Sequence, residues 1–393
     1  MPVVVRENIS WWSRLKQSFV GFLLSFVIVI AALLLLAWNE HRTLKNYKGL
    51  RAAGETVQSV AADPIDPSVD GKLIHFSAEV RSNQGVRDPD FGIEAPALVL
   101  RRSVEMYQWR EKKETTERDK LGGGKERVTT YSYEKVWDDD AINSSNFQES
   151  GHNNPGALPF SDARFAVTDA RIGARRAADN ILNSLNSSAL QLGEAGVFPN
   201  GFRRVDAETI YRGSNPGSPQ IGDVRVRYRA VPPQMASVIA QANGDSLLPW
   251  TSPAGTEIFL VETGQQSASS MVEHAQSSNS MLGWVLRAAG FGLLWIAFSM
   301  MLGPLKTIAA VLPPLGRAVG MFTGGVAFVL AAVLASVTIV LSWIFVRPLW
   351  AVSIVLAIVA VIAMWSRKSA KPAQAAAGMP PPMPPPPPPP PPR

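Results

Sequence analysis

Hydrophobic residues are concentrated in four long runs, one near the start of the chain and three near its end. The first run, residues 19–38, carries no charged side chain, and the other three are residues 283–303, 318–343 and 348–366. Each is close to the ~20 residues with which an α-helix crosses the hydrocarbon of a bilayer. None alternates polar and apolar residues as barrel strands do. The pattern therefore predicts four transmembrane helices.

Between the first two runs, residues 39–282 contain no apolar segment long enough to span a membrane. Several segments alternate with period two, as half-buried strands do: 72–80, 98–109, 127–137, 223–231 and 257–261. Helical spacing is seen over Asp169–Leu190, and over Gln266–Ser280 leading into the second run. The fold class expected is an integral membrane protein with four transmembrane α-helices, one N-terminal and three C-terminal, and an inserted α+β, sheet-rich soluble domain.

The polar ends and connections complete the expected organisation. Residues 1–18 form a basic N-terminus with Trp11 and Trp12 at the membrane interface, residues 304–317 a loop, and residues 367–393 a disordered tail. We expect both termini and this loop to be cytosolic and residues 39–282 to be extracytosolic. Charge supports that orientation only in part, because Arg42, Lys45, Lys48 and Arg51 argue for the opposite one.

Composition removes several classes of function. The formal net charge is +6, but the basic residues gather beside the apolar runs, which favours the surface of a lipid bilayer over nucleic acid as the partner. The chain has no cysteine, so disulfides, thiolate metal sites and cysteine nucleophiles are excluded. A membrane-embedded chain that is stabilised by packing is expected.

Few residues suggest a metal or cofactor. The cluster Asp138–Asp140, with Glu134 nearby, has oxygen ligands that suit calcium, but its spacing does not match an EF-hand and a solvated turn explains it more simply. The four histidines, His41, His75, His152 and His274, lack the spacing of a zinc site. We predict no metal and no cofactor.

Catalytic signatures are also missing. No GxSxG elbow is present, and the glycines of Gly122–Lys125 lack the full phosphate-loop pattern, so we expect an exposed hairpin tip there and no enzyme. The segment 100–110 offers a binding face through Arg101, Arg102, Tyr107 and Trp109. Strand alternation, with Val104, Met106 and Gln108 on one face, explains the same segment more simply. Arg287, near the start of the second run, is expected to snorkel to the headgroups.

A family resemblance rests on longer strings of residues. They are LRRSVEMYQW at 100–109, YSYEKVW at 131–137, INSSNF at 142–147, GHNNP at 151–155 and NPGSPQIGDVRVRY at 215–228, with NEHRTLK at 39–45, LRAAG at 286–290 and RPLWA at 347–351. By these strings the chain resembles the transmembrane protein 43 family, also called LUMA, over nearly everything except its termini. The proline tail departs from the family pattern.

The resemblance implies one amino-terminal span, a large non-cytosolic domain and three carboxy-terminal spans. It also implies a non-enzymatic membrane scaffold that self-associates, and the small-residue spacings Gly316/Gly320/Gly324 and Ala288/Gly292 suit close helix contacts. The alternative is a channel or carrier formed by the helix bundle. An animal member would lie in the endoplasmic reticulum or inner nuclear membrane with a lumenal domain. A bacterial member, which a cysteine-free chain with this tail suits, would lie in the inner membrane with a periplasmic domain.

The C-terminal tail contains a tract of nine prolines, residues 384–392. Because proline fixes φ and lacks a donor, the tract is expected to form a polyproline II rod. Such a rod suits a proline-reading protein with an SH3, WW or profilin-like groove. The alternative is a spacer.

Overall fold

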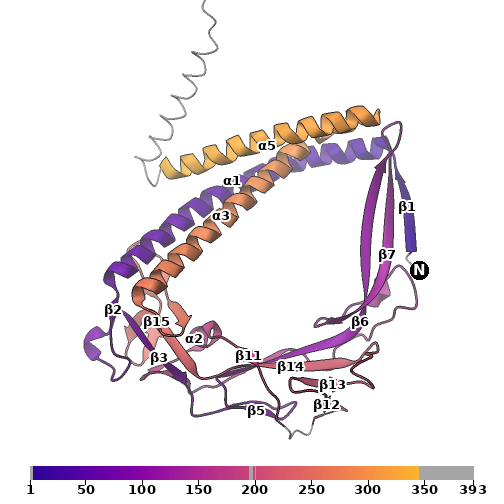
Figure 1. Ribbon diagram of the computed structural model, residues 1–393. Helices are drawn as coiled ribbons and strands as arrows, with labels where there is room; N and C mark the ends of the chain where they lie inside the picture. The colour runs from indigo at the N-terminus through magenta and orange to yellow at the C-terminus, as the bar shows by residue number, and fades with distance from the viewer. Residues whose placement is uncertain (1–2, 194–197, 200, 345–393) are drawn as a thin grey trace, which may run out of the picture. The chain divides into compact units, whose positions relative to one another are not determined.

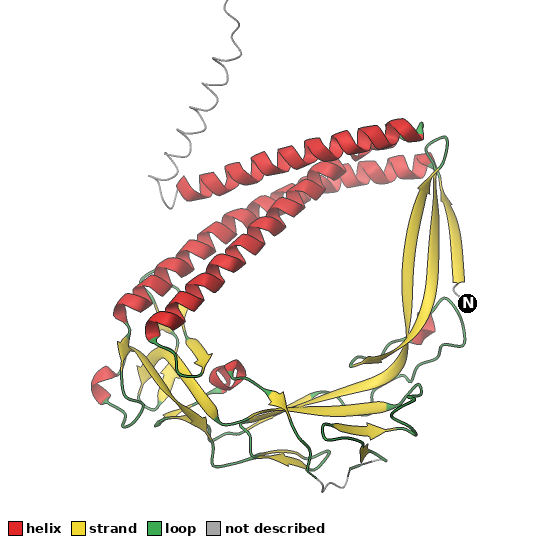
Figure 2. Cartoon of the chain, in the orientation of Figure 1, coloured by secondary structure: helices red, strands yellow, loops and turns green. Residues whose placement is uncertain are grey.

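The computed structural model describes residues 3–193, 198–199 and 201–344 and combines long helices with a sheet-rich domain (Figures 1 and 2). Three helices are long and apolar enough to cross a membrane: α1 (Trp11–Thr56), α3 (Ala268–Met301) and α5 (Pro313–Ile344). The fourth expected span, residues 348–366, and the tail lie outside the described residues. The contacts discussed below belong to one compact unit that ends at Ile339.

The helices are longer than the apolar runs that predicted them. α1 begins after Ser10, whose side chain accepts a hydrogen bond from the Ser13 amide at 3.2 Å, and it continues well beyond Trp38. α3 joins the helix expected over Gln266–Ser280 and the second apolar run into one continuous helix. The expected loop 304–317 contains the short helix α4 (Gly303–Ala309) and the first turn of α5.

The larger sheet has eight strands. Its main path runs in the order β1 (Val3–Ile9), β7 (Lys125–Asp138), β6 (Val99–Asp119), β14 (Val224–Val231), β13 (Thr209–Arg212) and β12 (Arg203–Arg204). β8 (Ala163–Ala166) also pairs with β6, and β11 (Ser188–Ala189) with β14. All these pairs are antiparallel, and β1 lies at one edge.

The second sheet has seven strands, in the order β10 (Arg175–Arg176), β9 (Arg171–Ile172), β3 (Leu73–Arg81), β15 (Gln234–Asn243) and β16 (Ser246–Leu248). β19 (Leu260–Thr263) pairs with β15, and β2 (Gln58–Ser59) runs parallel to β3. Two small hairpins, β4 (Val86–Asp88) with β5 (Ile93–Ala95) and β17 (Trp250–Thr251) with β18 (Glu257–Ile258), complete the strands of the described chain.

Four of the five predicted strand segments are confirmed, and the fifth, 257–261, is divided between β18 and β19, which belong to different sheets. The helix expected over Asp169–Leu190 is wrong for most of its length. That segment forms β9, β10 and β11, and only α2 (Asp179–Ser184) is helical. Gly173 adopts φ +58° between β9 and β10, and a Cβ there would lie 2.9 Å from the carbonyl oxygen of Ala62. The tight turn at this glycine ends any helix, and apolar residues at mixed spacing do not reveal it.

A single hydrophobic core joins the two sheets. It includes Phe76 from β3 and Val238 from β15, together with Val104 from β6 and Val226 from β14, all fully or almost fully buried. A second cluster fixes the helices to the smaller sheet, because Leu50 and Ala53 of α1 and Met271 of α3 pack with Ile239 of β15. The C-terminal end of α1 and the N-terminal end of α3 are therefore anchored on the domain.

Helix α1 and helix α3 approach closely where α3 has glycine. A Cβ on Gly290 would lie 2.5 Å and 2.6 Å from Cδ2 and Cγ of the buried Leu36, and one on Gly283 would lie 3.0 Å from Thr43 Oγ1. Small residues thus let the two helices touch. Of the spacings noted in the sequence, Gly316 and Gly320 lie against Ala310 and Lys306 of the same chain, whereas a Cβ on Gly292 or Gly324 would meet no non-neighbouring atom within 4 Å among the described residues.

Replacing Gly290 by alanine should weaken the α1–α3 contact. Its methyl group would overlap Leu36, and overpacking of this kind costs about 1–3 kcal/mol. Gly292→Ala is the matched control, because its methyl group meets open space two residues away and alanine is the better helix former by about 1 kcal/mol. Thermal unfolding in detergent, followed by circular dichroism, should show a lower midpoint for Gly290→Ala only. Equal shifts for both variants would contradict the close packing.

Candidate functional site

The residues first considered for metal binding are spread across the domain. Asp138 forms an ion pair with Arg110 and accepts a hydrogen bond from the Asp140 amide at 3.0 Å. His75 contacts Ser59 and the Gln266 carbonyl, His274 contacts Glu262, and His152 stacks on Tyr133. Within the described ranges no three histidine or acidic residues gather as a metal site.

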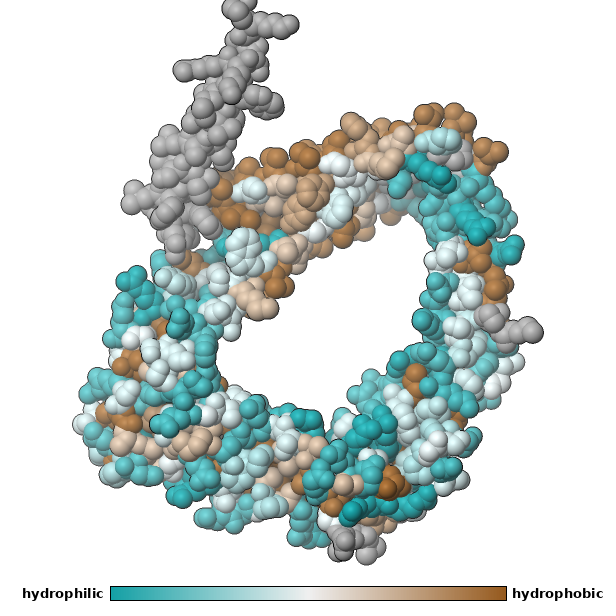
Figure 3. All heavy atoms as spheres, in the orientation of Figure 1, coloured by the Kyte–Doolittle hydropathy of each residue, from teal (hydrophilic) through white to brown (hydrophobic). Residues whose placement is uncertain are grey.

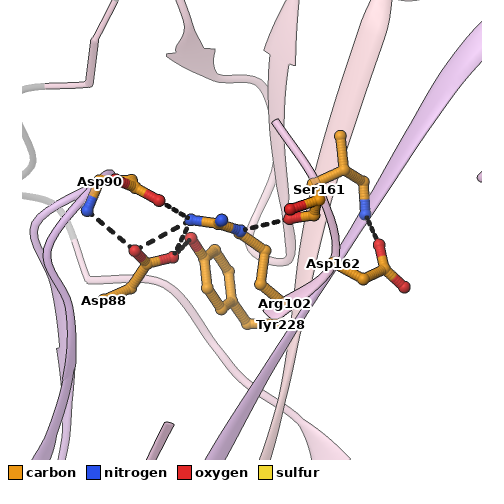
Figure 4. A network of polar contacts seen from close by, with 7 residues as sticks. Asp88, Asp90, Arg102, Ser161, Asp162 and Tyr228 are labelled. Carbon is orange, nitrogen blue, oxygen red and sulfur yellow. Dashed lines mark hydrogen bonds and ion pairs between the residues drawn. The ribbon is translucent and has the colours of Figure 1, made fainter. Parts of the chain in front are cut away.

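A buried polar network surrounds Arg102 of β6 (Figure 4). Its Nη1 donates to both carboxylate oxygens of Asp88, at 3.0 and 2.8 Å, and to Asp90 at 2.8 Å. Its Nε donates to the Ser161 carbonyl at 3.1 Å, and the Tyr228 hydroxyl donates to Asp88 at 2.6 Å. The Asp88 side chain is fully buried and that of Arg102 is 4% exposed. The network therefore ties β4, β6, β14 and the 158–162 segment together inside the core.

The chemistry of this network is that of a structural junction. The guanidinium carbon lies 5.3 Å from the ring centre of Phe91 and 5.7 Å from that of Phe160, so aromatic rings shield it from water. Burial and the hydrogen bond to Asp88 raise the pKa of the Tyr228 hydroxyl far above its ordinary value. The tyrosine therefore stays protonated and donates at every physiological pH, and within the network Asp90, whose side chain is 47% exposed, reaches the surface.

The suggested binding face on β6 is consequently divided between two surfaces. Arg102 follows the inward alternation of Val104, Met106 and Gln108, which are all buried. Tyr107 and Trp109 point to the other face, where Tyr107 packs on Trp137 and Trp109 on His152. The structural explanation of this segment holds for Arg102, and the four residues do not form one site.

Arg287 of α3 pairs with Glu40 of α1. Its Nε and Nη2 donate to the two carboxylate oxygens at 2.6 and 2.9 Å, and the exposed fractions of the two side chains are 16% and 4%. A bidentate pair of this kind is strong and directional. The expected snorkelling to the headgroups is therefore replaced by an ion pair inside the helix contact, with a partner 247 positions away in the chain.

The most unusual arrangement is the junction between the tip of the β6–β7 hairpin and the N-terminal end of α1. The Trp11 indole Nε1 donates to the Thr307 carbonyl of α4 at 2.9 Å, and Arg14 donates to the carbonyl of Gly123 at the tip. The Gly122 amide donates to the Val311 carbonyl at 3.3 Å. Gly123 has φ +80°, and a Cβ there would overlap the Trp11 ring. The tip expected to project into solvent is instead docked on the helices.

A basic cavity of about 490 Å³ lies at this junction. Four cationic side chains and one carboxylate contribute to its wall, with small and apolar residues between them: Arg14, Asp119, Lys125, Lys306, Ala310, Gly316, Arg317, Gly320 and Met321. The charged residues come from α1, from both strands of the hairpin, from α4 and from α5. We call this space the junction cavity.

Some of these cations are already neutralised. Arg14 lies 3.9 Å from Asp119, and Lys125 lies 2.6 Å from Glu117, whose pKa is lowered by hydrogen bonds from Lys125 and Arg127. Lys306 and Arg317 form no ion pair with another residue of the described part of the chain. The cavity therefore has excess positive charge beside apolar helix surface, which suits a phosphate group attached to an apolar molecule.

The residues of the junction cavity are distant from one another in the sequence. Lys306 and Arg317 lie within the expected loop 304–317, and Lys125 ends the glycine-rich segment of the hairpin tip. No local sequence pattern indicates that residues near 14, 125, 306 and 317 meet, because their contact depends on the docking of the hairpin tip on the helices. The charged hairpin, which is far longer than a solvated turn needs to be, was the available signal.

Comparison with known proteins agrees with this membrane architecture. The family model described as Transmembrane protein 43 matches residues 106–348. Transmembrane protein 43 of Mus musculus is 32% identical over 91% of this chain and 92% of its own length, and that of Homo sapiens is 30% identical over the same shares. The Transmembrane protein 43 homolog of Drosophila melanogaster is 25% identical over 70% of the chain and 74% of its own length. No solved structure matches the chain significantly.

Replacing Arg102 by methionine should destabilise the domain strongly. It leaves Asp88 buried without its counter-ion, and breaking a buried pair from one side costs about 3–5 kcal/mol. Adding Asp88→Asn to Arg102→Met should recover part of this loss because it removes the orphaned charge. Urea unfolding, followed by tryptophan fluorescence, gives the free energy of unfolding of the two single variants, Arg102→Met and Asp88→Asn, and of the double variant. Strictly additive effects of the two substitutions would contradict the coupling.

Proposed function

The chain belongs to the transmembrane protein 43 family, and we propose that it is a non-enzymatic membrane scaffold that self-associates and holds anionic lipid headgroups in its junction cavity. The observation that carries the proposal is the cavity itself. Cations from four elements, two of them without an ion pair, meet where apolar helices end, beside Trp11 and the exposed Trp12. Tryptophan and basic residues are typical of the headgroup level of a bilayer.

Anionic phospholipid fits this cavity better than a small soluble anion. Its phosphate would pair with Lys306 and Arg317, while its acyl chains would follow the apolar surface of α5, where Met321 and Phe322 are 75% and 72% exposed. Each basic side chain near an anionic surface contributes about 1 kcal/mol. Headgroup binding would thereby fix the position of the protein in the membrane and enrich such lipids around it.

Self-association is supported by the free edge of the larger sheet. β1 ends the strand order, so its outer hydrogen-bonding groups have no partner strand within the described chain, and Val4 and Val5 are 49% and 39% exposed. Exposed edge strands readily pair with strands of other chains. A second copy joined at this edge would extend the sheet beside the membrane, as a scaffold requires.

The rival function is a channel or carrier formed by the helices. Solute flux into proteoliposomes that contain single copies of the chain would favour the channel or carrier over the scaffold.

The expected locations, bacterial inner membrane or endoplasmic reticulum and inner nuclear membrane, remain part of the proposal. So does docking of a proline-reading protein on the tail, whose residues lie outside the described ones; unchanged partners for a chain ending at Lys371 would contradict the docking.

Removing the two unpaired cations should weaken retention of anionic lipid. Lys306→Gln with Arg317→Gln is expected to lower the apparent affinity roughly fivefold for each lost charge, as about 1 kcal/mol per cation implies. Lys112→Gln with Lys113→Gln removes the same charge from the exposed part of the hairpin and serves as the control. Native mass spectrometry of lipid adducts measures the effect. Competition by inorganic phosphate alone would point to a soluble anion, and equal losses for both double variants would contradict a specific cavity.

Proline at the edge should reveal whether β1 joins copies. Successive residues of an antiparallel strand direct their N–H groups to opposite edges, so Val4→Pro and Val5→Pro remove donors from opposite sides of β1. We expect one of the two to reduce the mass of the detergent-extracted complex to that of a single chain while leaving the domain folded. A wild-type complex with the mass of one chain would exclude self-association.

A further inference from the structure

A group of basic residues follows the apolar run of α1. Beyond Trp38 they recur at every third position: Arg42, Lys45, Lys48 and Arg51. Arg51 is paired with Glu55 at 2.9 Å. The other three form no ion pair within the part of the chain that the structure describes. Three cations at the end of a membrane-length apolar run therefore have no paired carboxylate.

The acidic residues near this part of α1 do not balance these cations. Glu40 accepts two hydrogen bonds from Arg287, at 2.6 and 2.9 Å. α1 has no other acidic residue before Glu55, and α3 has none after Glu273. The β17–β18 hairpin, which packs on α1, adds the exposed Glu257. Even with Glu257 counted against them, two of the three cations lack a compensating charge.

Arg42 lies beside Trp38, where the apolar run ends. Its guanidinium carbon is 5.9 Å from the ring centre of Trp38, which is 56% exposed. The Nε atom of Arg42 is buried without a hydrogen-bond partner among the described residues, and Nη2 has a long contact of 3.4 Å with Thr43 Oγ1. An aromatic ring attracts a cation but brings no negative charge to neutralise it. Arg42 therefore keeps both charge and hydrogen-bonding capacity that the described chain does not use.

Lys45 is positioned by the turn between β17 and β18. The Thr256 hydroxyl donates to the Lys45 carbonyl at 3.1 Å, and a Cβ on Gly255 would lie 3.6 Å from the Lys45 ammonium nitrogen. Residues three apart on a helix are neighbours on its surface. Lys45 therefore lies next to Arg42 on a stretch of α1 whose backbone is fixed by the domain.

Distance along the helix separates these two cations from the next. Tryptophan is typical of the membrane interface, and the polar layer outside the hydrocarbon is about 5–8 Å thick on each side. At 1.5 Å per residue, Arg42 lies about 6 Å beyond Trp38 and Lys45 about 10 Å. Lys48 lies about 15 Å beyond it. Helical side chains lean toward the N-terminus of their helix, which for these residues is toward the apolar run. Arg42 and the long stem of Lys45 therefore reach the headgroup layer, whereas Lys48 lies beyond it.

The same side of α1 is apolar on the turns that precede Arg42. Ile30, Leu34 and Trp38 follow one another at four-residue spacing and are 59%, 66% and 56% exposed. Arg42 continues this stripe at the same spacing, and Lys45 follows three residues later. Figure 3 shows the corresponding change along the helices, from hydrophobic atoms to hydrophilic atoms where they approach the smaller sheet. One side of α1 thus offers apolar surface for an acyl chain that ends in two cations.

We propose that Arg42 and Lys45 bind the phosphate of an anionic phospholipid whose acyl chain lies along Leu34 and Trp38. Arginine forms strong charge-assisted hydrogen bonds with phosphate, and lysine binds it as a point charge. A phospholipid fits better than a soluble anion because the cations directly follow an exposed apolar stripe. The site lies at the opposite end of the apolar run from Arg14 and is independent of the junction cavity.

This site also gives a role to basic residues that conflict with the expected orientation. Basic residues beside a span act as orientation signals when they gather on the cytosolic side. Cations that hold a lipid phosphate are needed at their own level of the membrane on either side. Arg42 and Lys45 are therefore explained by the ligand and do not have to act as signals.

Single substitutions in the full chain test the site. Arg42→Gln and Lys45→Gln should each weaken binding of phosphatidylglycerol roughly fivefold, because each removes one cation near the headgroup. Lys48→Gln removes the same charge about one helical turn further along and is the matched control. Native mass spectrometry of detergent-extracted protein with added lipid counts the adducts, and circular dichroism verifies that each variant is folded. An equal loss of adducts from all three variants, or no loss from Lys45→Gln, would overturn the proposal.

A second set of measurements identifies the ligand. Phosphatidylcholine carries its phosphate beside a compensating ammonium group, so its adducts should be fewer. Equal binding of the two lipids, or displacement of phosphatidylglycerol by inorganic phosphate alone, would contradict an anionic phospholipid. Adding Arg42→Gln to Lys306→Gln with Arg317→Gln should multiply the losses, because the sites are separate. Losses from the cavity substitutions without any from Arg42→Gln and Lys45→Gln would leave the cavity proposal standing and overturn this one.

Discussion

The anchoring of α1 at both ends to one polar domain is the constraint on which the rest of the structure depends. Leu50 and Ala53 pack at one end, and Trp11 and Arg14 bind at the other. The domain must reach both points, which explains why β6 and β7 extend far beyond the core as a charged hairpin. It also explains why the tip glycines are needed, because at Gly123 a side chain would overlap Trp11. The junction cavity exists only because these elements meet.

Such an extended hairpin needs a rigid base, and the Arg102 network supplies it. Arg102 lies in the buried first half of β6, before the charged hairpin begins, and its partners come from β4, β14 and the 158–162 segment. A buried ion pair contributes little net stability compared with apolar packing, but its geometry is specific. Fixing the direction of β6 at this point fixes where the hairpin tip arrives, so a network remote from the membrane positions residues that meet the helices.

The sequence was sufficient for features with local causes. Period-two alternation located the strands of the core, and β6 turned Val104, Met106 and Gln108 inward as that pattern predicts. Apolar length located three long helices and the string matches located the family. The helix expected over Asp169–Leu190 was wrong because a glycine turn outweighs apolar spacing. The Glu40–Arg287 pair and the junction cavity were not predictable, because each brings together segments more than 100 residues apart and no local sequence pattern indicates that they meet.

The same distinction governs membrane topology. An apolar run of ~20 residues shows that a helix can be accommodated in hydrocarbon. Its length does not determine the tilt of the helix axis relative to the bilayer. Direction is set by what the two ends must contact. In this chain one end of α1 follows an edge strand that pairs with the domain, and the other end enters the core of that same domain. The seven residue pairs of that ladder satisfy backbone groups of β1, and the core contact buries Leu50 and Ala53 at the other end of the helix. Long-range pairing therefore fixes what the two ends of α1 contact, which the length of the apolar run does not.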